Sequence, residues 1–222
     1  MTDVLIPIKS LQRAKQRLAR VLSADERAGL VLAMLRDLLG ALGTWETGNV
    51  WIISADDAVI ATGRAFGAQA IREARSHGYN EAVLVGLESL PLDTSVVVLP
   101  GDLPCAIGAE LKQLATAQPS TDAQIHVVPD RDRMGTNGLY LSSPRLIKPA
   151  FGPHSFDAHK QAARAAGAKL SPMRLTGLGK DIDTPDDLSE FAASCATGET
   201  SQYLSDIGFA PDRDIGRQRS VA

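Results

Sequence analysis

The chain has 222 residues, of which 44% are hydrophobic and 22% charged, and its net charge is −3. This length and composition fit one globular α/β domain, or one domain with a tail. The near-neutral charge and the 5% of aromatic residues exclude a basic or base-stacking surface for nucleic acid, and no apolar run is long enough to cross a bilayer. No signal peptide is visible, and Cys105 and Cys195 lack metal-type spacing, so we expect a cytoplasmic protein with reduced thiols.

Short apolar runs alternate with stretches of helical periodicity along the chain. Strands are predicted over residues 4–7, 50–53, 69–71, 96–99, 123–128, 138–142 and 169–175. Helices are predicted after Ser23, over 56–66, 80–90, 107–117 and 155–166, and from Thr184 onward. This alternation predicts an α/β fold with a mostly parallel central sheet and helices on both faces.

Several helix starts have recognisable caps. Ser23 with Glu26 forms a capping-box pattern, and Thr184 precedes Pro185 and two aspartates. Ser155 is predicted as the N-cap of its helix. After about residue 196 the composition turns polar with little periodicity, which predicts a domain over 1–195 and a tail over 196–222. We expect the tail to be weakly ordered or an interaction segment, with disorder the favoured reading.

A cluster of positive charge follows the first strand. Residues 8–18 read as a loop that carries Lys9, Arg13, Lys15 and Arg17. A loop at a strand end can present cations and backbone N–H groups to phosphates. The stretch has neither the GK[ST] of a Walker A loop nor a GxGxxG fingerprint. By pattern alone a solvated basic loop is the better interpretation, with phosphate binding as the alternative.

An aspartate follows the most apolar strand. Residues 96–99 are unbroken apolar residues, and the chain then reads Pro100-Gly101-Asp102. Such a run is typical of a strand buried on both faces, and ligands bind outside the carboxyl ends of strands in open α/β sheets. Asp102 is therefore a candidate ligand-binding carboxylate. The alternative is a cap for the helix predicted from residue 107, and the pattern does not decide between the two.

A second acidic pair lies late in the chain. Asp181 and Asp183 are separated by one residue, so in an extended stretch both carboxylates point to the same side. Together with a third carboxylate, such a pair can hold Mg²⁺, which prefers oxygen ligands and keeps substrate phosphates in its shell. The alternative is that Asp183 merely precedes the cap at Thr184, and by pattern alone this alternative is slightly favoured.

Two segments rich in glycine and hydroxyl residues complete the candidate sites. They are Gly135-Thr136-Asn137-Gly138 and the stretch from Phe151 to Phe156. Small residues let an anionic ligand approach the backbone, although two ordinary turns would have the same composition. His154 and His159 lack partners at metal-ligand spacing and are interpreted as surface or supporting groups. No nucleophile is placed beside a base in the sequence.

Taken together, these motifs resemble one family over residues 4–192. The resemblance is carried by Pro7-x-Lys9, Ala14-Lys15-x-Arg17-Leu18, Gly78-x-Asn80-x-Ala82, Gly101-Asp102-Leu103-Pro104, Gly135-Thr136-Asn137-Gly138-Leu139, Phe151-Gly152-Pro153-x-Ser155-Phe156-x-x-His159 and Asp181-Ile182-Asp183-Thr184-Pro185. The chain resembles the guanylyltransferases of coenzyme F420 biosynthesis. They act on 2-phospho-L-lactate, phosphoenolpyruvate or 3-phospho-D-glycerate.

The resemblance implies a Rossmann-like nucleotidyltransferase that binds GTP and Mg²⁺. It would transfer GMP to a small phosphorylated three-carbon acid and release pyrophosphate, and a homodimer is compatible with it. Matching motifs assign Lys15 and Asp102 to catalysis, Asp102, Asp181 and Asp183 to the metal, Lys9, Lys15, Gly78 and Asn80 to the nucleotide, and Thr136, Gly152 and Ser155 to the acceptor acid.

Three other functions remain open at this point. A nucleotidyltransferase acting on a molybdenum cofactor or a sugar phosphate should have a glycine-rich first loop, which Ile8-Lys9-Ser10-Leu11 lacks. A non-catalytic nucleotide-binding homologue would not need three metal-type carboxylates. An Asp-x-Asp glycosyltransferase normally carries its acidic pair after a mid-chain strand, whereas Asp181 and Asp183 lie late.

Overall fold

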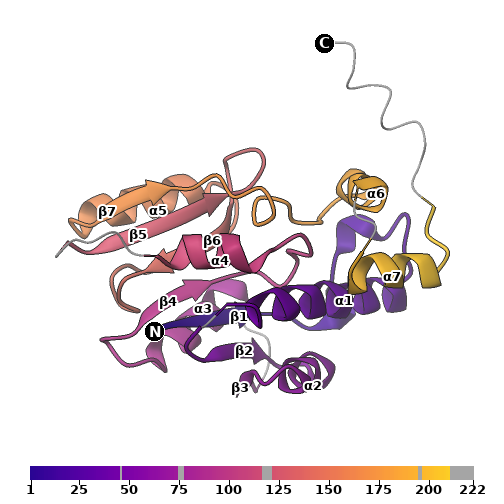
Figure 1. Cartoon of the computed structure of the whole chain (residues 1–222), viewed down its shortest axis with the longest axis horizontal. Helices are drawn as coiled ribbons and strands as arrows, with labels where there is room; N and C mark the ends of the chain where they lie inside the picture. The colour runs from indigo at the N-terminus through magenta and orange to yellow at the C-terminus, as the bar shows by residue number, and fades with distance from the viewer. Residues whose placement is uncertain (46, 75–77, 117–121, 195–196, 211–222) are drawn as a thin grey trace, which may run out of the picture.

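The computed structural model describes residues 1–45, 47–74, 78–116, 122–194 and 197–210. A seven-stranded sheet with the order β3-β2-β1-β4-β6-β5-β7 forms its centre (Figure 1). The strands are β1 (Thr2–Pro7), β2 (Val50–Ser54), β3 (Gln69–Arg72), β4 (Ser95–Val98), β5 (Gln124–Pro129), β6 (Thr136–Leu141) and β7 (Lys169–Pro172). Only β6 runs antiparallel to its neighbours, β4 and β5, so the predicted mostly parallel sheet is confirmed.

Helices cover both faces of this sheet, as predicted. They are α1 (Ala24–Leu42), α2 (Asp57–Ala65), α3 (Tyr79–Glu88), α4 (Gly108–Ala115), α5 (Ser155–Ala165), α6 (Pro185–Ser194) and α7 (Glu199–Asp206). The apolar side chains of α1, α2, α4, α6 and α7 share one hydrophobic cluster, and those of α3 and α5 belong to the cluster on the other face. In the described residues, no helix combines the length and the apolar character needed to span a membrane.

Successive side chains along a strand belong alternately to these two clusters. In β1, Val4 and Ile6 join the α1 side, whereas Leu5 joins the α3 side. In β4, Val97 faces α1 while Val96 and Val98 face the other way. All of these side chains are fully buried. A strand covered on both faces has no reason to alternate with polar residues, which explains the continuous apolar run that identified β4.

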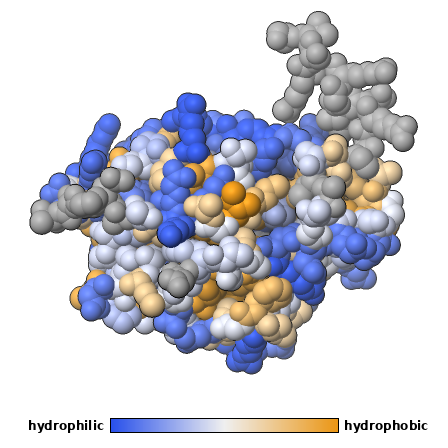
Figure 2. All heavy atoms as spheres, in the orientation of Figure 1, coloured by the Kyte–Doolittle hydropathy of each residue, from blue (hydrophilic) through white to orange (hydrophobic). Residues whose placement is uncertain are grey.

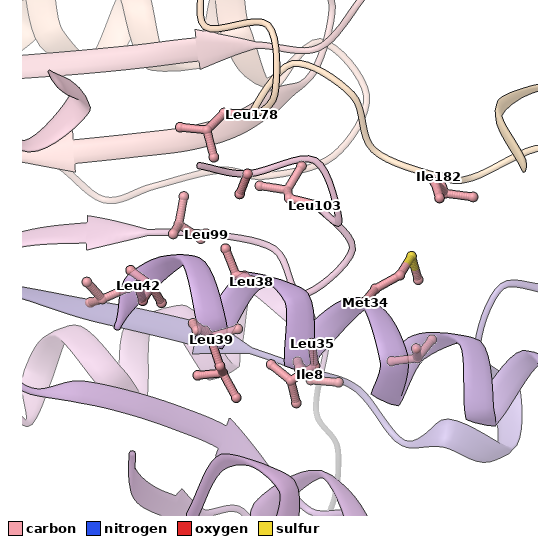
Figure 3. Close-up of a cluster of buried hydrophobic side chains, with 14 of the residues drawn as sticks. Ile8, Met34, Leu35, Leu38, Leu39, Leu42, Leu99, Leu103, Leu178 and Ile182 are labelled. Carbon is pink, nitrogen blue, oxygen red and sulfur yellow. The ribbon is translucent and has the colours of Figure 1, made fainter. Parts of the chain in front are cut away.

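Helix α1 has more buried residues than any other described helix. Its Ser23 capping box is present, because Ser23 and Glu26 exchange side-chain and backbone hydrogen bonds. Figure 3 shows Met34, Leu35, Leu38, Leu39 and Leu42 of this helix in one buried cluster with Leu99 and Leu103, which follow β4. Leu178 and Ile182 enter the same cluster from a segment much later in the chain.

The reversed direction of β6 matters for the position of its first residues. Val98, the last residue of β4, pairs with Leu139 of β6. Because β6 is antiparallel, it begins at the sheet edge where the parallel strands end. Thr136 and Asn137, its first two residues, are therefore delivered to the edge where the sequence predicts ligand binding.

The connection predicted as a loop over residues 8–18 contains two short 3₁₀ helices, η1 (Leu11–Arg13) and η2 (Gln16–Leu18). The Ser10 hydroxyl accepts a hydrogen bond from the Gln12 N–H at the start of η1. Leu11 and Leu18 are buried, so apolar anchors fold the connection back onto the domain. The loop prediction was wrong here because it weighed the basic residues and not these two leucines.

The prediction of a weakly ordered tail was wrong for residues 199–206, which form α7. Asp37 of α1 accepts hydrogen bonds from the N–H groups of Glu199 and Thr200, at 2.7 and 2.9 Å. The Tyr203 hydroxyl donates to the Glu26 carbonyl at 3.0 Å, and Leu204 is buried. Figure 1 shows α7 lying against α1. Residues 211–222 of the tail lie outside the described residues. Figure 2 shows hydrophilic and apolar side chains mixed over the displayed face of the molecule.

Candidate functional site

A pocket of about 400 Å³ opens at the carboxyl edge of the sheet. It is enclosed by the connection after β1, the turn after β4, the start of α3 and the segment before α6. Its charged lining consists of Lys9, Arg13, Lys15, Arg17, Asp102 and Asp183. The structure therefore brings together the basic connection, the mid-chain aspartate and one late aspartate, and an excess of positive charge faces the pocket.

Lys15 is the centre of this charge cluster. Its ammonium nitrogen lies 2.5 Å from Asp102 Oδ2 and 2.6 Å from Asp183 Oδ1, and its side chain is 9% exposed. Burial alone would lower the pKa of Lys15, but the two carboxylates outweigh it and raise the pKa. Lys15 also has a φ of 47°, in the left-handed region, a conformation that costs a non-glycine residue energy. The two ion pairs hold it in this conformation.

Asp102 follows β4 as predicted, and it does not cap a helix. The N-cap of α4 is Ile107, without a side-chain hydrogen bond, so the capping alternative is excluded. Leu103, buried next to Asp102, anchors the turn in the core. One carboxylate oxygen, Oδ2, binds Lys15, whereas Oδ1 is shielded from solvent and has no hydrogen-bond partner among the described residues.

Asp181 and Asp183 are positioned by the residue between them. Ile182 is 2% exposed and packs in the α1 cluster, and its N–H points to the Asp102 carbonyl oxygen at 3.4 Å. Asp181 accepts a hydrogen bond from the Asn137 side chain at 3.0 Å. Thr184 does cap α6, since its hydroxyl accepts from the Asp187 N–H. Asp183 nevertheless does more than precede the cap, because it binds Lys15.

The two late carboxylates have opposite electrostatic environments. Burial raises the pKa of Asp181 to about 6, and the nearby Asp102 charge adds to this effect. Burial also acts on Asp183, but Lys15 and then Arg17 outweigh it and lower its pKa. A cation bound near Asp181 would relieve the repulsion with Asp102, whereas Asp183 already has its cation.

The residues fit a divalent cation in donor chemistry. Among the described residues no three His, Cys, Asp or Glu side chains already stand as a metal-binding group, because the Lys15 ammonium lies between Asp102 and Asp183. Asp102 Oδ1 is, however, a buried oxygen without a partner, and buried polar atoms are rarely left so. Asp181 supplies a second oxygen donor that feels the charge of Asp102. Hard oxygen donors of this kind suit Mg²⁺.

The predicted acceptor residues Thr136 and Ser155 lie together beneath the surface. Both are buried, and the Ser155 hydroxyl donates to Thr136 Oγ1 at 3.2 Å. Ser155 is the first residue of α5 and not its N-cap, a position that His154 takes in a left-handed conformation. The N-cap prediction was wrong because the Ser155 hydroxyl is used by Thr136.

His159 is the third member of this hydrogen-bond network. It is fully buried, its Nε2 accepts a hydrogen bond from the Ala150 N–H at 3.2 Å, and its Nδ1 lies 3.0 Å from Thr136 Oγ1. Since Nε2 accepts, Nδ1 must carry the proton and donate to Thr136. Thr136 Oγ1 then accepts from both His159 and Ser155. Its own hydroxyl proton is left to donate to a ligand.

We expect the stability of the protein to fall on acidification because of His159. Burial lowers the pKa of His159 to about 4 from 6.5. The unfolded chain takes up a proton between these values while the folded protein does not, so the stabilisation is complete above pH 6.5 and lost as the pH falls towards 4. Urea unfolding from pH 7 to pH 4 should show an extra loss of up to about 3 kcal/mol in wild type relative to His159→Asn. Parallel pH curves for the two proteins would exclude a buried neutral His159.

The remaining predicted site residues have partners of their own. The Asn80 side chain donates to the Phe151 carbonyl at 2.9 Å and accepts from the Phe151 N–H at 2.7 Å, so its amide holds the acceptor segment. Gly152 has a φ of +131°, which other residues rarely adopt, and open space lies where a Cβ would be. Gly78 precedes α3 with a φ of +125°. The guanosine contacts assigned to Gly78 and Asn80 stay predictions.

Two residues of the site were not assigned roles from sequence, and a third, His159, was interpreted only as a surface or supporting group. Asn137 holds Asp181, His159 supports Thr136, and Tyr79 lines the pocket beside Asp102. Asn137 and His159 belong to the motifs that carry the family resemblance, so the sequence did indicate that both are functional residues. Tyr79 could have been suspected as the first residue of a helix that starts at the ligand-binding edge of the sheet.

Comparison with protein families gives a match over nearly the whole chain. A family described as "Guanylyl transferase CofC like" matches residues 2–221. A phosphoenolpyruvate guanylyltransferase from Sphaerobacter thermophilus is 37% identical, with 90% of this chain and 97% of the relative covered. A 3-phospho-D-glycerate guanylyltransferase from Phenylobacterium zucineum is 33% identical, with 93% and 97% covered.

Comparison with solved structures supports the fold. A nucleotidyl transferase from Methanothermobacter superposes with a TM-score of 0.66 and 12% identity, covering 93% of this chain and 99% of that chain. At this identity the likeness shows the fold alone, which is the Rossmann-like fold of nucleotidyltransferases. The two relatives named above have different acceptor acids in their names at similar identity.

Proposed function

The chain belongs to the CofC-like guanylyltransferase family, and from this premise we propose that it transfers GMP from GTP to a phosphate oxygen of a small phosphorylated three-carbon acid. Phosphoenolpyruvate, 3-phospho-D-glycerate and 2-phospho-L-lactate are the candidate acceptors, and pyrophosphate is the leaving group. We place this reaction in coenzyme F420 biosynthesis and in the cytoplasm. The observation that carries the proposal is the Lys15–Asp102–Asp183 cluster in a pocket with three further cations.

The reaction suits a site without a general base. A phosphate monoester has a second pKa of about 6, so the acceptor is mostly dianionic at neutral pH and can attack without losing a proton. Its oxygen forms a bond to the α-phosphorus of GTP, and the bond from that phosphorus to the pyrophosphate oxygen breaks. The obstacle is repulsion between two polyanions, which binding and charge neutralisation must overcome.

The cations of the pocket address this repulsion. An ammonium group has three N–H donors, and Lys15 uses two of them for Asp102 and Asp183. The third is free for a phosphate oxygen. Lys9, Arg13 and Arg17 line the same pocket and would neutralise the remaining charge of the triphosphate. Asp102 and Asp181 would hold Mg²⁺, together with Asp183 through Oδ2, the oxygen that does not contact Lys15. The ion supplies Lewis-acid polarisation of the phosphates when bound.

The acceptor would bind on the Thr136 side of the site. The free hydroxyl proton of Thr136 is a donor for a carboxylate or phosphate oxygen, and the open space at Gly152 lets an anion approach the backbone. The Asn80–Phe151 hydrogen bonds fix the segment that carries Gly152 relative to α3. The proposed acceptor residues are therefore held in place by contacts that do not use the ligand.

The proposal is tested with an acceptor panel. Purified protein is incubated with GTP, Mg²⁺ and each of the three acids, and both the pyrophosphate and the mass of the guanylylated product are measured. We expect pyrophosphate only when an acceptor is present, with one acid preferred. Parallel reactions with ATP, CTP and UTP test the choice of nucleotide. If none of the three acids supports the release of pyrophosphate, the proposed reaction is refuted.

We expect Thr136→Ala to weaken the acceptor selectively. Loss of one hydrogen bond to a charged group corresponds to a rise of about 10- to 100-fold in the acceptor KM. GTP binding should stay close to wild type, because Thr136 does not line the nucleotide pocket. Thr136→Ser, which keeps the hydroxyl, is the matched control and should restore most of the affinity. Equal weakening of both substrates would show that the acceptor assignment is wrong.

A further inference from the structure

Two buried oxygen atoms at the nucleotide pocket lack partners. In the part of the chain that the structure describes, three buried side-chain atoms have no hydrogen bond: the Tyr79 hydroxyl, Asp102 Oδ1 and the Thr200 hydroxyl of α7. The first two belong to residues that line the same pocket. Tyr79 is also close enough to Asp102 to feel its charge. An unpaired donor and an unpaired acceptor therefore belong to residues of one pocket and do not bond each other.

The ring of Tyr79 is held in place by contacts that do not involve its hydroxyl. Tyr79 is the first residue of α3, directly after Gly78, whose positive φ turns the chain into the helix. The ring stacks edge to face on Phe151, with centroids 5.1 Å apart and planes at 73°. The next residue, Asn80, bonds the backbone of Phe151 in both directions. A phenylalanine could make the same ring contacts.

The unpaired hydroxyl therefore lowers the stability of the ligand-free protein. A buried hydroxyl that gives up its bonds to water without gaining a protein partner destabilises the folded state. Burial and the Asp102 charge both raise the pKa of Tyr79, so the group stays protonated and acts as a donor. What it lacks is an acceptor oxygen, and the neighbouring cations of the pocket select anionic ligands.

We propose that the Tyr79 hydroxyl donates a hydrogen bond to a phosphate oxygen of the bound nucleotide, which makes Tyr79 a further nucleotide-binding residue. The inference rests on the proposed function for the identity of the ligand as GTP. It assigns Tyr79 to the nucleotide and not to the acceptor because Tyr79 lines the pocket of Lys9, Lys15 and Asp102. Its contact with Phe151 also places it next to the acceptor segment.

The test compares two variants that each remove one hydroxyl oxygen. Tyr79→Phe removes the unpaired group, and Tyr203→Phe removes a hydroxyl that donates to the Glu26 carbonyl at 3.0 Å on the α1–α7 contact. Thermal unfolding is measured without ligands, and the Kd of GTP with Mg²⁺ is measured by calorimetry without an acceptor acid.

The two variants should behave in opposite ways. We expect Tyr79→Phe to unfold at the same or a higher temperature than wild type and to bind GTP about 5- to 20-fold more weakly. Tyr203→Phe should unfold at a lower temperature and bind GTP like wild type. A Tyr79→Phe protein that is less stable than wild type would show a structural partner for the hydroxyl and overturn the inference. An unchanged GTP affinity of Tyr79→Phe would overturn the inference as well, even if the KM for the acceptor acid rises.

Failure of the proposed function gives a different result. If wild type binds no GTP but binds another nucleoside triphosphate, the guanylyl assignment fails, and the same pair of variants is compared with that nucleotide. If wild type binds no nucleoside triphosphate, the inference fails together with the proposed function. Wild-type binding of GTP with an unaltered Tyr79→Phe affinity overturns the role of Tyr79 alone.

Discussion

Replacing Asp102 by Asn should reduce turnover by about 100- to 1,000-fold while the protein stays folded. The Asn side chain keeps the shape of Asp102, and its carbonyl oxygen can still accept from Lys15 in place of Oδ2. Its amide nitrogen then stands where Oδ1 stood, and an amide NH₂ group cannot hold a cation. The variant therefore loses the oxygen that is free for metal while it keeps a hydrogen bond to Lys15. The kcat with GTP, Mg²⁺ and the preferred acceptor measures this loss.

A matched variant separates this effect from a general loss of charge. Asp57 is an exposed carboxylate that pairs with Arg72 on the surface, so Asp57→Asn should leave turnover unchanged. Without Mg²⁺, Asp102→Asn removes a negative charge from the pocket and should bind GTP as well as wild type or better. Turnover of Asp102→Asn within fivefold of wild type would exclude Asp102 as the metal anchor.

Replacing Lys15 by Met should cost both stability and activity. Asp102 and Asp183 each lie within 2.6 Å of the Lys15 nitrogen, and Met leaves both carboxylates without their cation. Removing one partner of a buried ion pair typically costs 3–5 kcal/mol, and because Asp183 is half-exposed we expect about 3 kcal/mol. Urea unfolding at pH 7 measures this cost. Turnover should fall as well, because the third N–H of Lys15 no longer meets the phosphates.

The neighbouring Lys9 provides the control for this prediction. Lys9 lines the same pocket, and no carboxylate partner is seen for it within the described ranges. Lys9→Met should weaken GTP binding and leave the free energy of unfolding within about 0.5 kcal/mol of wild type. In the double variant Lys15→Met/Asp102→Asn, the destabilisation should be smaller than the sum of the two single changes, because one of the stranded charges is gone. Additive costs would contradict the ion-pair account.

Much of the architecture follows from local sequence. The apolar run before Pro100 defines β4, the capping box at Ser23 starts α1, and Thr184 with Pro185 starts α6. The rule that ligands bind at the carboxyl ends of parallel strands made Asp102 a candidate site residue, and the family resemblance joined it to the basic connection. These features depend on residues close together in the chain, where pattern and structure correspond directly.

The rest depends on contacts between distant segments. The 3₁₀ helices of the basic connection form because Leu11 and Leu18 are buried, and α7 forms because Asp37 caps it from another helix. The Asn80 side-chain amide bonds the backbone of Phe151 through both its oxygen and its nitrogen. No local pattern reports such pairings, since each joins residues that are far apart in sequence.

The position of α7 on α1 has a consequence for synthesis on the ribosome. Helix α1 is made early, and the segment that covers its outer edge, from Glu199 to Asp206, emerges only after nearly all the rest of the domain. At about 5–20 residues per second, this edge of α1 stays uncovered for about 10 to 30 seconds. A nascent chain that has completed its sheet strands still exposes the surface that Leu204 will bury. Helix α7 therefore packs on α1 last, and the domain completes its folding only after its carboxyl-terminal part has been synthesised.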